Sequence, residues 1–349
     1  MNIFTPDLFA RFNESGVLSF RTVDSSRGED DLRHTALVEY QDGTRLAVKA
    51  SHNSFTTPER VAGWADLART YRASGVYCPL YVPALSGKLC FDWESDGTTF
   101  LICAEEYKQF LSADEFTPPV PEEDYREPML ETIGRIAAHP ARPVPWMSAY
   151  CLYDRFCEED ETDETHANAL ALFSLLLEAM PEREAEINRF RADYLRLRDS
   201  FEPEYRALPT AVFQADLNSS NILLDENRVF RGLIDFNLSG SETILNYALV
   251  ESLIPPADED ELPRLTDPEY LLEKDAQLSS NLSVIARHYA FTKAERLAWP
   301  TLYRLVVPFR WPVFCLLRHA LREKKTQFYS AILRWLQYQF YRTDISLPE

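Results

Sequence analysis

The chain has 349 residues, of which 46% are hydrophobic and 13% aromatic, so it can bury a sizeable core and is not predicted to be disordered. Its 55 acidic and 36 basic residues give a formal net charge of −19, which argues against nucleic-acid or anionic-membrane partners and favours a cationic small substrate. The six cysteines include no Cys-x₂-Cys pair, which favours reduced thiols over disulfides or zinc.

No targeting or membrane segment is predicted. The first ten residues lack a basic start followed by a sustained apolar stretch. The most apolar region, residues 302–317, is interrupted by Arg304, Pro308, Arg310 and Pro312 and is too short to span a bilayer. A cytoplasmic protein is therefore expected.

The first predicted elements form a β-hairpin and a helix. Residues 37–40 and 44–49 read as strands joined by a turn at Gln41-Asp-Gly43, and the hairpin ends in Lys49. Thr57 followed by Pro58 is a helix start, with threonine as N-cap and proline at the first helical position. An apolar strand at residues 100–103 comes next and runs into a polar connection.

Beyond that connection the sequence is mainly helical in pattern. Residues 114–145 are punctuated by prolines, and helical patterns follow at residues 165–180, 182–200, 293–302 and 326–341. The acidic run at residues 158–164 has two interpretations. It is a solvated helix N-terminus favoured by the helix dipole, or it lines a cleft for a cationic acceptor.

Three short apolar runs interrupt this helical part, at residues 211–213, 222–224 and 232–234. Each is too short for a helix, so strands are predicted, with residues 225–228 as the turn between the last two. The strand ends carry Asp216, Asn221 and Asp235. Two carboxylates and a carboxamide are oxygen ligands suited to Mg²⁺ beside a triphosphate, which points to phosphoryl transfer.

The spacing of these residues resembles the catalytic core of protein-kinase-like enzymes. The closer match is the aminoglycoside phosphotransferase family, with choline kinases as relatives, in which His-Gly-Asp-Leu-(His/Asn)-x-x-Asn-Ile-Leu leads into Ile-Asp-Phe. The aligned segments here are Gln214-Ala-Asp-Leu-Asn-Ser-Ser-Asn-Ile-Leu223 and Ile234-Asp-Phe236. The resemblance implies an α+β, two-lobed protein-kinase-like fold. A small β-rich nucleotide lobe (residues 1–107) would end in a hinge, and a larger, mainly helical lobe (residues 108–349) would carry the catalytic loop and the metal motif.

The resemblance also assigns roles around the metal. Asp216 is implied as the catalytic base, and Asn221 and Asp235 as the ligands of Mg²⁺. Lys49 would face the α- and β-phosphates of the nucleotide.

Three further residues are implied in nucleotide binding. Glu59, in the first turn of the helix that starts at Thr57, would hold Lys49, although the helix dipole also favours an acid there. The backbone from Glu105 to Tyr107 would form the hinge that hydrogen-bonds the adenine.

The catalytic motifs depart from the family pattern in two places. Gln214-Ala215 stands where His-Gly is usual, and Asn237 follows Asp-Phe at a position expected to need a positive φ. The segment before the first hairpin has one glycine, Gly28, instead of the glycine-rich phosphate loop of a protein kinase; a glycine-poor loop is common in the family that the chain resembles. Asp30 and Asp31 there would repel a triphosphate unless they point away.

The predicted function is transfer of the γ-phosphate of ATP, with GTP as the alternative donor, to a hydroxyl of a small, cationic molecule. The departures leave a second hypothesis open, a pseudokinase or nucleotide-binding regulatory protein. A third keeps the site but transfers AMP. The sequence predicts neither the acceptor nor the oligomeric state.

Overall fold

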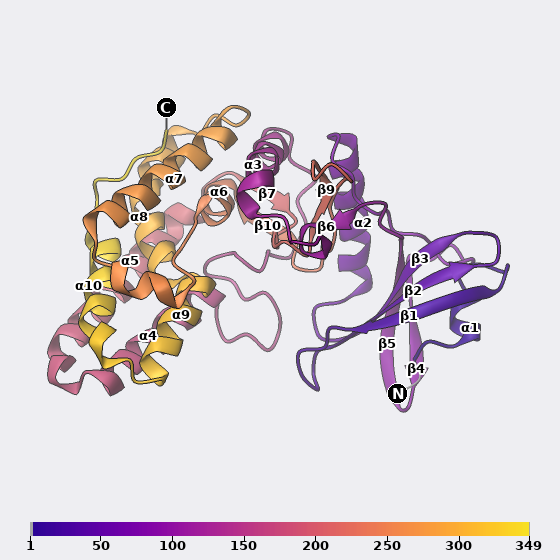
Figure 1. Ribbon diagram of the computed structural model, residues 1–349, viewed down its shortest axis with the longest axis horizontal. Coiled ribbons are helices and arrows are strands. Elements are labelled where there is room, and N and C mark those ends of the chain that lie inside the picture. Colours follow the sequence, from indigo (N-terminus) through magenta and orange to yellow (C-terminus); the bar gives the residue numbers. More distant parts are fainter. Residues whose placement is uncertain (1–2, 349) are drawn as a thin grey trace. The chain divides into compact units, whose positions relative to one another are not determined.

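A computed structural model describes residues 3–348, and they divide into two compact units (Figure 1). The first unit combines residues up to 125 with residues 157–159 and 216–239. The second combines residues 126–156, 160–215 and those from 240 onward. The lobe boundary expected at residue 107 is a functional division, and it stays a prediction.

The first unit is built on a five-stranded antiparallel sheet with the strand order β1-β2-β3-β5-β4 (Figure 1). Its strands are β1 (Val17–Asp24), β2 (Leu32–Tyr40), β3 (Arg45–His52), β4 (Cys90–Ser95) and β5 (Thr98–Glu106). One face packs its alternate side chains into a core with the short helix α1 (Pro6–Phe9); Val38, Val48 and Ile102 are among the buried residues. The hairpin β2–β3 and strand β5 confirm the sequence prediction, whereas β1 and β4 were not predicted.

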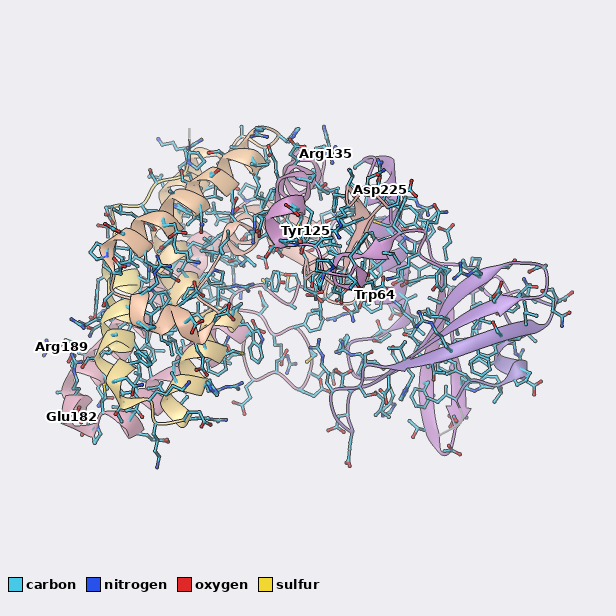
Figure 2. All side chains as sticks on the ribbon, in the orientation of Figure 1. Trp64, Tyr125, Arg135, Glu182, Arg189 and Asp225 are labelled. Carbon is cyan, nitrogen blue, oxygen red and sulfur yellow. The ribbon has the colours of Figure 1, made fainter. Side chains whose placement is uncertain are left out.

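Helix α2 (Pro58–Ala73) follows β3. Its N-cap is the one predicted, because the Thr57 hydroxyl accepts a hydrogen bond from the Arg60 N–H at 3.3 Å. Val61, Trp64 and Leu67 lie at helical spacing on its buried side; Trp64 is labelled in Figure 2.

A second small sheet completes this unit. It has the order β6-β8-β9, with β6 (Leu111–Ser112), β8 (Ile222–Leu224) and β9 (Phe230–Leu233). The β8–β9 turn is the one predicted, and the carboxylate of Asp225, labelled in Figure 2, accepts hydrogen bonds from the N–H groups of Asn227 and Val229.

Gly232 in β9 lies against the backbone of Tyr77, to which β9 is hydrogen-bonded on both sides of this glycine. A Cβ atom added at Gly232 would stand 1.8 Å from the Tyr77 carbonyl oxygen. Backbone cannot yield as a flexible side chain does, so we expect Gly232→Ala to lower the free energy of unfolding by about 3 kcal/mol. Urea denaturation measures this loss.

The matched control is Gly43→Ala, which has open space around it but a φ of 84°. Gly43→Ala should lower the free energy of unfolding only through the strain of an alanine at a positive φ, by about 1 kcal/mol. Equal losses in the two variants would contradict the steric explanation.

The second unit is mainly helical. Its helices are α3 (Glu122–Ala138, whose first four residues belong to the first unit), α4 (Glu164–Ala179), α5 (Glu184–Tyr205), α6 (Ile244–Ser252), α7 (Pro268–Ala286), α8 (Lys293–Val306), α9 (Trp311–Arg322) and α10 (Tyr329–Tyr341). A two-stranded antiparallel sheet joins β7 (Thr210–Phe213) to β10 (Gly240–Thr243). Short 3₁₀ turns lie at Ala113–Glu115 in the first unit and at Pro181–Arg183, Glu259–Arg264, Val307–Phe309 and Thr326–Phe328 in the second.

The predicted α+β class, with a β-rich part and a mainly helical part, is thus confirmed. Each of the predicted helical stretches contains a helix, and residues 302–317 fold into parts of α8 and α9. Within residues 3–348, no helix is both long and apolar enough to cross a membrane.

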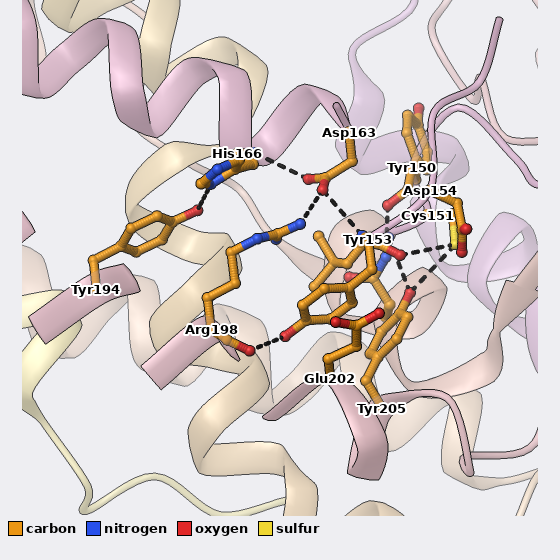
Figure 3. Close-up of polar contacts among 12 residues, drawn as sticks. Tyr150, Cys151, Tyr153, Asp154, Asp163, His166, Tyr194, Arg198, Glu202 and Tyr205 are labelled. Atoms are coloured by element: carbon orange, nitrogen blue, oxygen red, sulfur yellow. Dashed lines mark hydrogen bonds and ion pairs between the residues drawn. The ribbon is translucent and has the colours of Figure 1, made fainter. Parts of the chain in front are cut away.

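The acidic run ends in a buried ion pair of the second unit (Figure 3). Asp163 pairs with Arg198, accepts the N–H of His166 at 2.9 Å as N-cap of α4, and accepts the N–H of Tyr153 at 3.0 Å. Asp163 is 3% exposed. Asp163 is therefore at a helix start, as one interpretation of the run predicted, but it is buried in an ion pair and not solvated.

Removing the Asp163 carboxylate leaves Arg198 buried without its counter-charge. We expect Asp163→Ala to lower the free energy of unfolding by about 3 kcal/mol, measured by thermal and urea unfolding. Glu161→Ala, at an exposed position of the same run, is the control and should change stability by less than about 0.5 kcal/mol. A loss in the control as large as that in Asp163→Ala would refute the assignment.

Candidate active site

The loop before β8 holds Asp216 and Asn221 against each other. Nδ2 of Asn221 donates to the Asp216 carboxylate at 3.0 Å and to its backbone carbonyl at 2.9 Å. Asn218 donates to the other carboxylate oxygen at 2.7 Å. Because both protons of the Asn221 amide are directed at Asp216, its Oδ1 is the atom that can serve a ligand.

Asp235 follows β9 and is brought next to Asn221 by backbone pairing, since the Ile234 N–H donates to the Asn221 carbonyl at 3.0 Å. Its φ is 61°, in the left-handed region that non-glycine residues adopt at a cost. This strained backbone conformation sets the direction of the Asp235 side chain.

Lys49 connects these residues to the five-stranded sheet. Its Nζ lies 2.8 Å from the Glu105 carboxylate and 3.6 Å from that of Asp235. Burial alone would lower the pKa of Lys49, but the charges of Glu105 and Asp235 outweigh it and raise the pKa above its ordinary value. Lys49 therefore stays an ammonium at physiological pH.

The structure pairs Lys49 with Glu105 and not with Glu59. The register places Ala47 opposite Glu105 and Lys49 opposite Cys103, so these side chains share one face of the sheet. Glu59 is exposed in the first turn of α2, where the helix dipole accounts for an acid. A role for Glu59 in nucleotide binding stays a prediction.

Glu105 is therefore the residue whose side chain the sequence interpretation missed, since only its backbone was assigned a role. A signal was present: a glutamate at the end of the apolar run Phe100-Leu-Ile-Cys-Ala faces inward two residues after Cys103. A carboxylate that is 5% exposed needs a cation beside it.

A cavity of about 320 Å³ opens beside Lys49. Apolar side chains of Leu37, Ala47 and Ile234 form part of its wall, and the polar lining includes Asn221 and Asp235. The size and the mixture of apolar wall with a few polar groups are typical of a small-molecule site.

The segment expected to form the hinge lines the same cavity. The N–H groups of Glu106 and Tyr107 are already used, by the carbonyls of Leu80 at 2.9 Å and Arg45 at 3.2 Å. The next N–H, that of Lys108, has no hydrogen-bond acceptor within the described residues. A nucleotide base bound in this cavity would accept its hydrogen bond from this N–H, which lies one residue beyond the predicted hinge segment.

The donor set fits a divalent cation. Burial raises the pKa of the Asp216 carboxyl, the Asn218 hydrogen bond opposes this, and the charge of Asp235 raises the pKa further, as two facing carboxylates do.

Oδ1 of Asn237 is buried without a hydrogen-bond partner in the described part of the chain and lines a second cavity with Asp235. Over residues 3–348 no cluster of three acidic, histidine or cysteine ligands occurs. These few oxygens suit Mg²⁺, which keeps waters and phosphates as its other ligands.

One of the three acids in the loop between β1 and β2 is neutralised by neighbouring residues. The Asp31 carboxylate accepts hydrogen bonds from Nε and Nη2 of Arg33 at 2.7 and 2.6 Å and from Nδ2 of Asn53 at 3.0 Å. Arg27, in the same loop, lowers the pKa of Asp216 by its positive charge. The expected repulsion is therefore removed at Asp31, and the loop contributes a cation.

The departures from the family pattern strain the backbone at a different residue from the one expected. Ala215, in the place of the usual glycine, has a φ of 63°, whereas Asn237 is not in the positive-φ region. The neighbouring Gln214 is fully buried. Backbone strain therefore falls on Ala215, immediately before Asp216.

A model of the phosphotransferase enzyme family matches residues 12–245, about two thirds of the chain, including every residue described above as part of this site. The chain belongs to the phosphotransferase enzyme family. This confirms the resemblance and the prediction of an enzyme that transfers phosphate.

Similarity to a solved structure supports the fold of this phosphotransferase. An aminoglycoside phosphotransferase from Alicyclobacillus acidocaldarius subsp. acidocaldarius DSM 446 is 13% identical with a TM-score of 0.51, covering 97% of this chain and 98% of that one. A microcompartment-associated aminopropanol kinase is 15% identical (TM-score 0.48, 97% and 98% covered). An amicoumacin kinase in complex with AMP-PNP and Ca²⁺ is 15% identical (TM-score 0.49, 96% and 91% covered). A search of curated protein sequences found no match to the phosphotransferase.

Proposed function

We propose that this phosphotransferase is a small-molecule kinase that moves the γ-phosphate of ATP to a hydroxyl group. The observation that carries the proposal is the grouping of Lys49, Asn221 and Asp235 in the wall of one cavity of about 320 Å³. A cation, a carboxamide and a carboxylate are the groups that bind a metal-bound triphosphate.

Each side chain has a role in this proposal. Lys49, held as an ammonium by Glu105, binds the phosphates, while Asn221 and Asp235 hold Mg²⁺, which neutralises charge on the transferred group. The backbone N–H of Lys108, which follows Glu105 and Tyr107 in the cavity wall, orients the adenine of ATP by a hydrogen bond. Asp216 orients the acceptor hydroxyl and accepts its proton as the oxygen attacks phosphorus.

The acceptor is a small molecule with a hydroxyl group, and the net charge of −19 favours one that carries an ammonium group. The predicted cytoplasmic location, where ATP is available, fits the proposal. The pseudokinase alternative draws its support from the single glycine in the loop that precedes β2.

Calorimetric titration with ATP and GTP, with and without Mg²⁺, tests the proposal without knowledge of the acceptor. We expect metal-dependent binding of ATP, followed by ADP release when amino alcohols, aminoglycosides or sugars are added. A product heavier by AMP instead of phosphate would indicate nucleotidyl transfer. Binding of neither nucleotide by the folded protein would refute the kinase.

The raised pKa of Asp216 predicts the pH dependence of turnover. A base acts as its carboxylate, so kcat/KM falls when the pH drops through this pKa, and the acid limb lies above the ordinary value of 3.8. Asn218→Ala removes a hydrogen bond that lowers this pKa, so the limb moves to higher pH.

The neighbouring Ser219→Ala is the control, because Ser219 is exposed and gives Asp216 no hydrogen bond in the described residues. Profiles of kcat/KM at saturating Mg²⁺ compare the three proteins. An acid limb that stays in place in Asn218→Ala would count against Asp216 as the base.

A further inference from the structure

The cavity beside Lys49 has two ends, which the register of the five-stranded sheet sets apart. One row of side chains crosses four neighbouring strands and lines the cavity: Arg21, Leu37, Ala47 and Glu105. Lys49 lies two residues after Ala47 on the same face, about 7 Å further along β3. The antiparallel strand β5 leaves Glu105 in the opposite direction, toward Lys108. The cavity therefore has a phosphate end at Lys49 and a hinge end at Lys108, with the row between them.

Glu115 lines the cavity and is fixed at its hinge end. It lies in the 3₁₀ turn Ala113–Glu115 of the first unit. Its Oε2 accepts hydrogen bonds from Nζ of Lys108 at 2.5 Å and from the N–H of Ser112 at 2.7 Å. Nζ of Lys108 also donates to the Ser112 hydroxyl at 2.8 Å. The carboxylate is thus held beside the residue whose N–H would orient the base.

The second oxygen of this carboxylate, Oε1, accepts no hydrogen bond within residues 3–348. Partial burial alone would raise the pKa of Glu115, but the hydrogen bonds from Lys108 and Ser112 and the charge of Arg21 lower it below its ordinary value. The group is therefore ionised at neutral pH. An ionised carboxylate only accepts hydrogen bonds, so Oε1 can serve a ligand that offers a donor.

ATP has two kinds of donor at neutral pH, the amino group of adenine and the hydroxyls of the ribose. The amino group is adjacent to a ring nitrogen, and when this nitrogen accepts the Lys108 N–H the amino group faces the hinge backbone. The ribose joins the base to the triphosphate, so it lies between the hinge end and the phosphate end. Its hydroxyls are the donors that remain for Glu115.

We propose that Glu115 binds the ribose of the nucleotide, with Oε1 accepting hydrogen bonds from the 2′- and 3′-hydroxyls, so that the protein selects ribonucleotides over dideoxynucleotides. The inference rests on the proposed function, which brings a nucleotide into the cavity. Lys108 and Arg21 balance the charge of Glu115, and the triphosphate lies at the other end, so this acid is compatible with an anionic ligand.

Mg²⁺-ATP and Mg²⁺-2′,3′-dideoxy-ATP are suitable probes, because they share the base and the triphosphate and differ in the two hydroxyls. Calorimetric titration of the full chain gives both dissociation constants. We expect ATP to bind at least about tenfold more tightly, as for a hydrogen bond to a charged group. The Glu115 side chain is 39% exposed, which keeps the ratio near this lower bound. In Glu115→Ala the ratio should fall to about twofold or less.

The ratio of the two constants separates a ribose ligand from a residue that only supports the turn, because a general loss of affinity affects both nucleotides equally. Glu115→Gln keeps an oxygen for the Ser112 N–H without the charge, and its ratio should lie between those of the native protein and Glu115→Ala. If Glu115→Ala does not fold, Glu115→Gln decides. Asp114→Ala changes the exposed neighbour in the same turn and is the control, with an unchanged ratio.

Equal binding of the two nucleotides by the native protein, or a native ratio in the Glu115 variants, would overturn the proposal and leave the kinase standing. Binding of neither nucleotide would refute both. A ratio that depends on Glu115 without phosphorylation of any acceptor would support the ribose site and count against the proposed function.

Discussion

Asp216→Asn is expected to lower turnover by about 10²–10⁴-fold while the dissociation constant for Mg²⁺-ATP changes by no more than about twofold. The amide has nearly the same shape but cannot accept the proton of the acceptor hydroxyl. It can still accept a hydrogen bond from Asn218 or from Asn221, so the loop keeps part of its support. Acceptor-dependent ADP release and calorimetric titration measure the two quantities on the same preparation.

The control for this prediction is Asp225→Asn. Asp225 accepts hydrogen bonds from backbone N–H groups in a turn of the first unit and pairs with Arg231, whereas Asp216 is hydrogen-bonded to Asn221 of the candidate site. It should cost stability and leave turnover per folded molecule unchanged. Normal turnover by Asp216→Asn would remove Asp216 from the mechanism.

Asp235→Ala is expected to abolish the Mg²⁺-dependent part of nucleotide binding, a loss of at least about 100-fold in affinity at millimolar Mg²⁺. The carboxylate is the charged group that Asp235 offers to the cation, and Lys49 keeps Glu105 as its partner when Asp235 is removed. The phosphate-binding ammonium therefore survives the substitution.

Titration without Mg²⁺ separates a metal ligand from a merely structural residue. The negatively charged Asp235 carboxylate repels the triphosphate when no metal is bound. Removing it should let metal-free ATP bind Asp235→Ala at least as well as the native protein. A variant that loses both kinds of binding would indicate damage to the fold. A variant that keeps the Mg²⁺ dependence would show that the metal lies elsewhere.

Local signals in the sequence predicted the elements around the site. The turn at Gln41-Asp-Gly43, the Thr57-Pro58 helix start and the short strand at residues 222–224 each have a chemical signature a few residues long, and each is present. The motif residues Asp216, Asn221 and Asp235 were predicted from the sequence pattern. The pairing of β8 with β9 brings Asn221 next to Asp235, and hydrogen bonds hold Asp216 to Asn221.

What the sequence could not predict depends on contacts across long separations. Glu105 reaches Lys49 over 56 positions through the register of β3 and β5, which no local pattern specifies. Strand β1 has almost no buried side chains, so its alternation is weak. Helix α3 was hidden by prolines, yet it accommodates Pro128 in its interior.

The candidate site belongs to a unit that the chain leaves and re-enters. Lys49 and Glu105 come from the part before residue 126, whereas Asp216, Asn221 and Asp235 come from residues 216–239. No single proteolytic cut, and no terminal truncation, can release this unit with its site intact. Recombination between relatives at one crossover between residues 105 and 216 would likewise combine the lysine of one parent with the metal-binding oxygens of the other. The two segments are therefore expected to be inherited together.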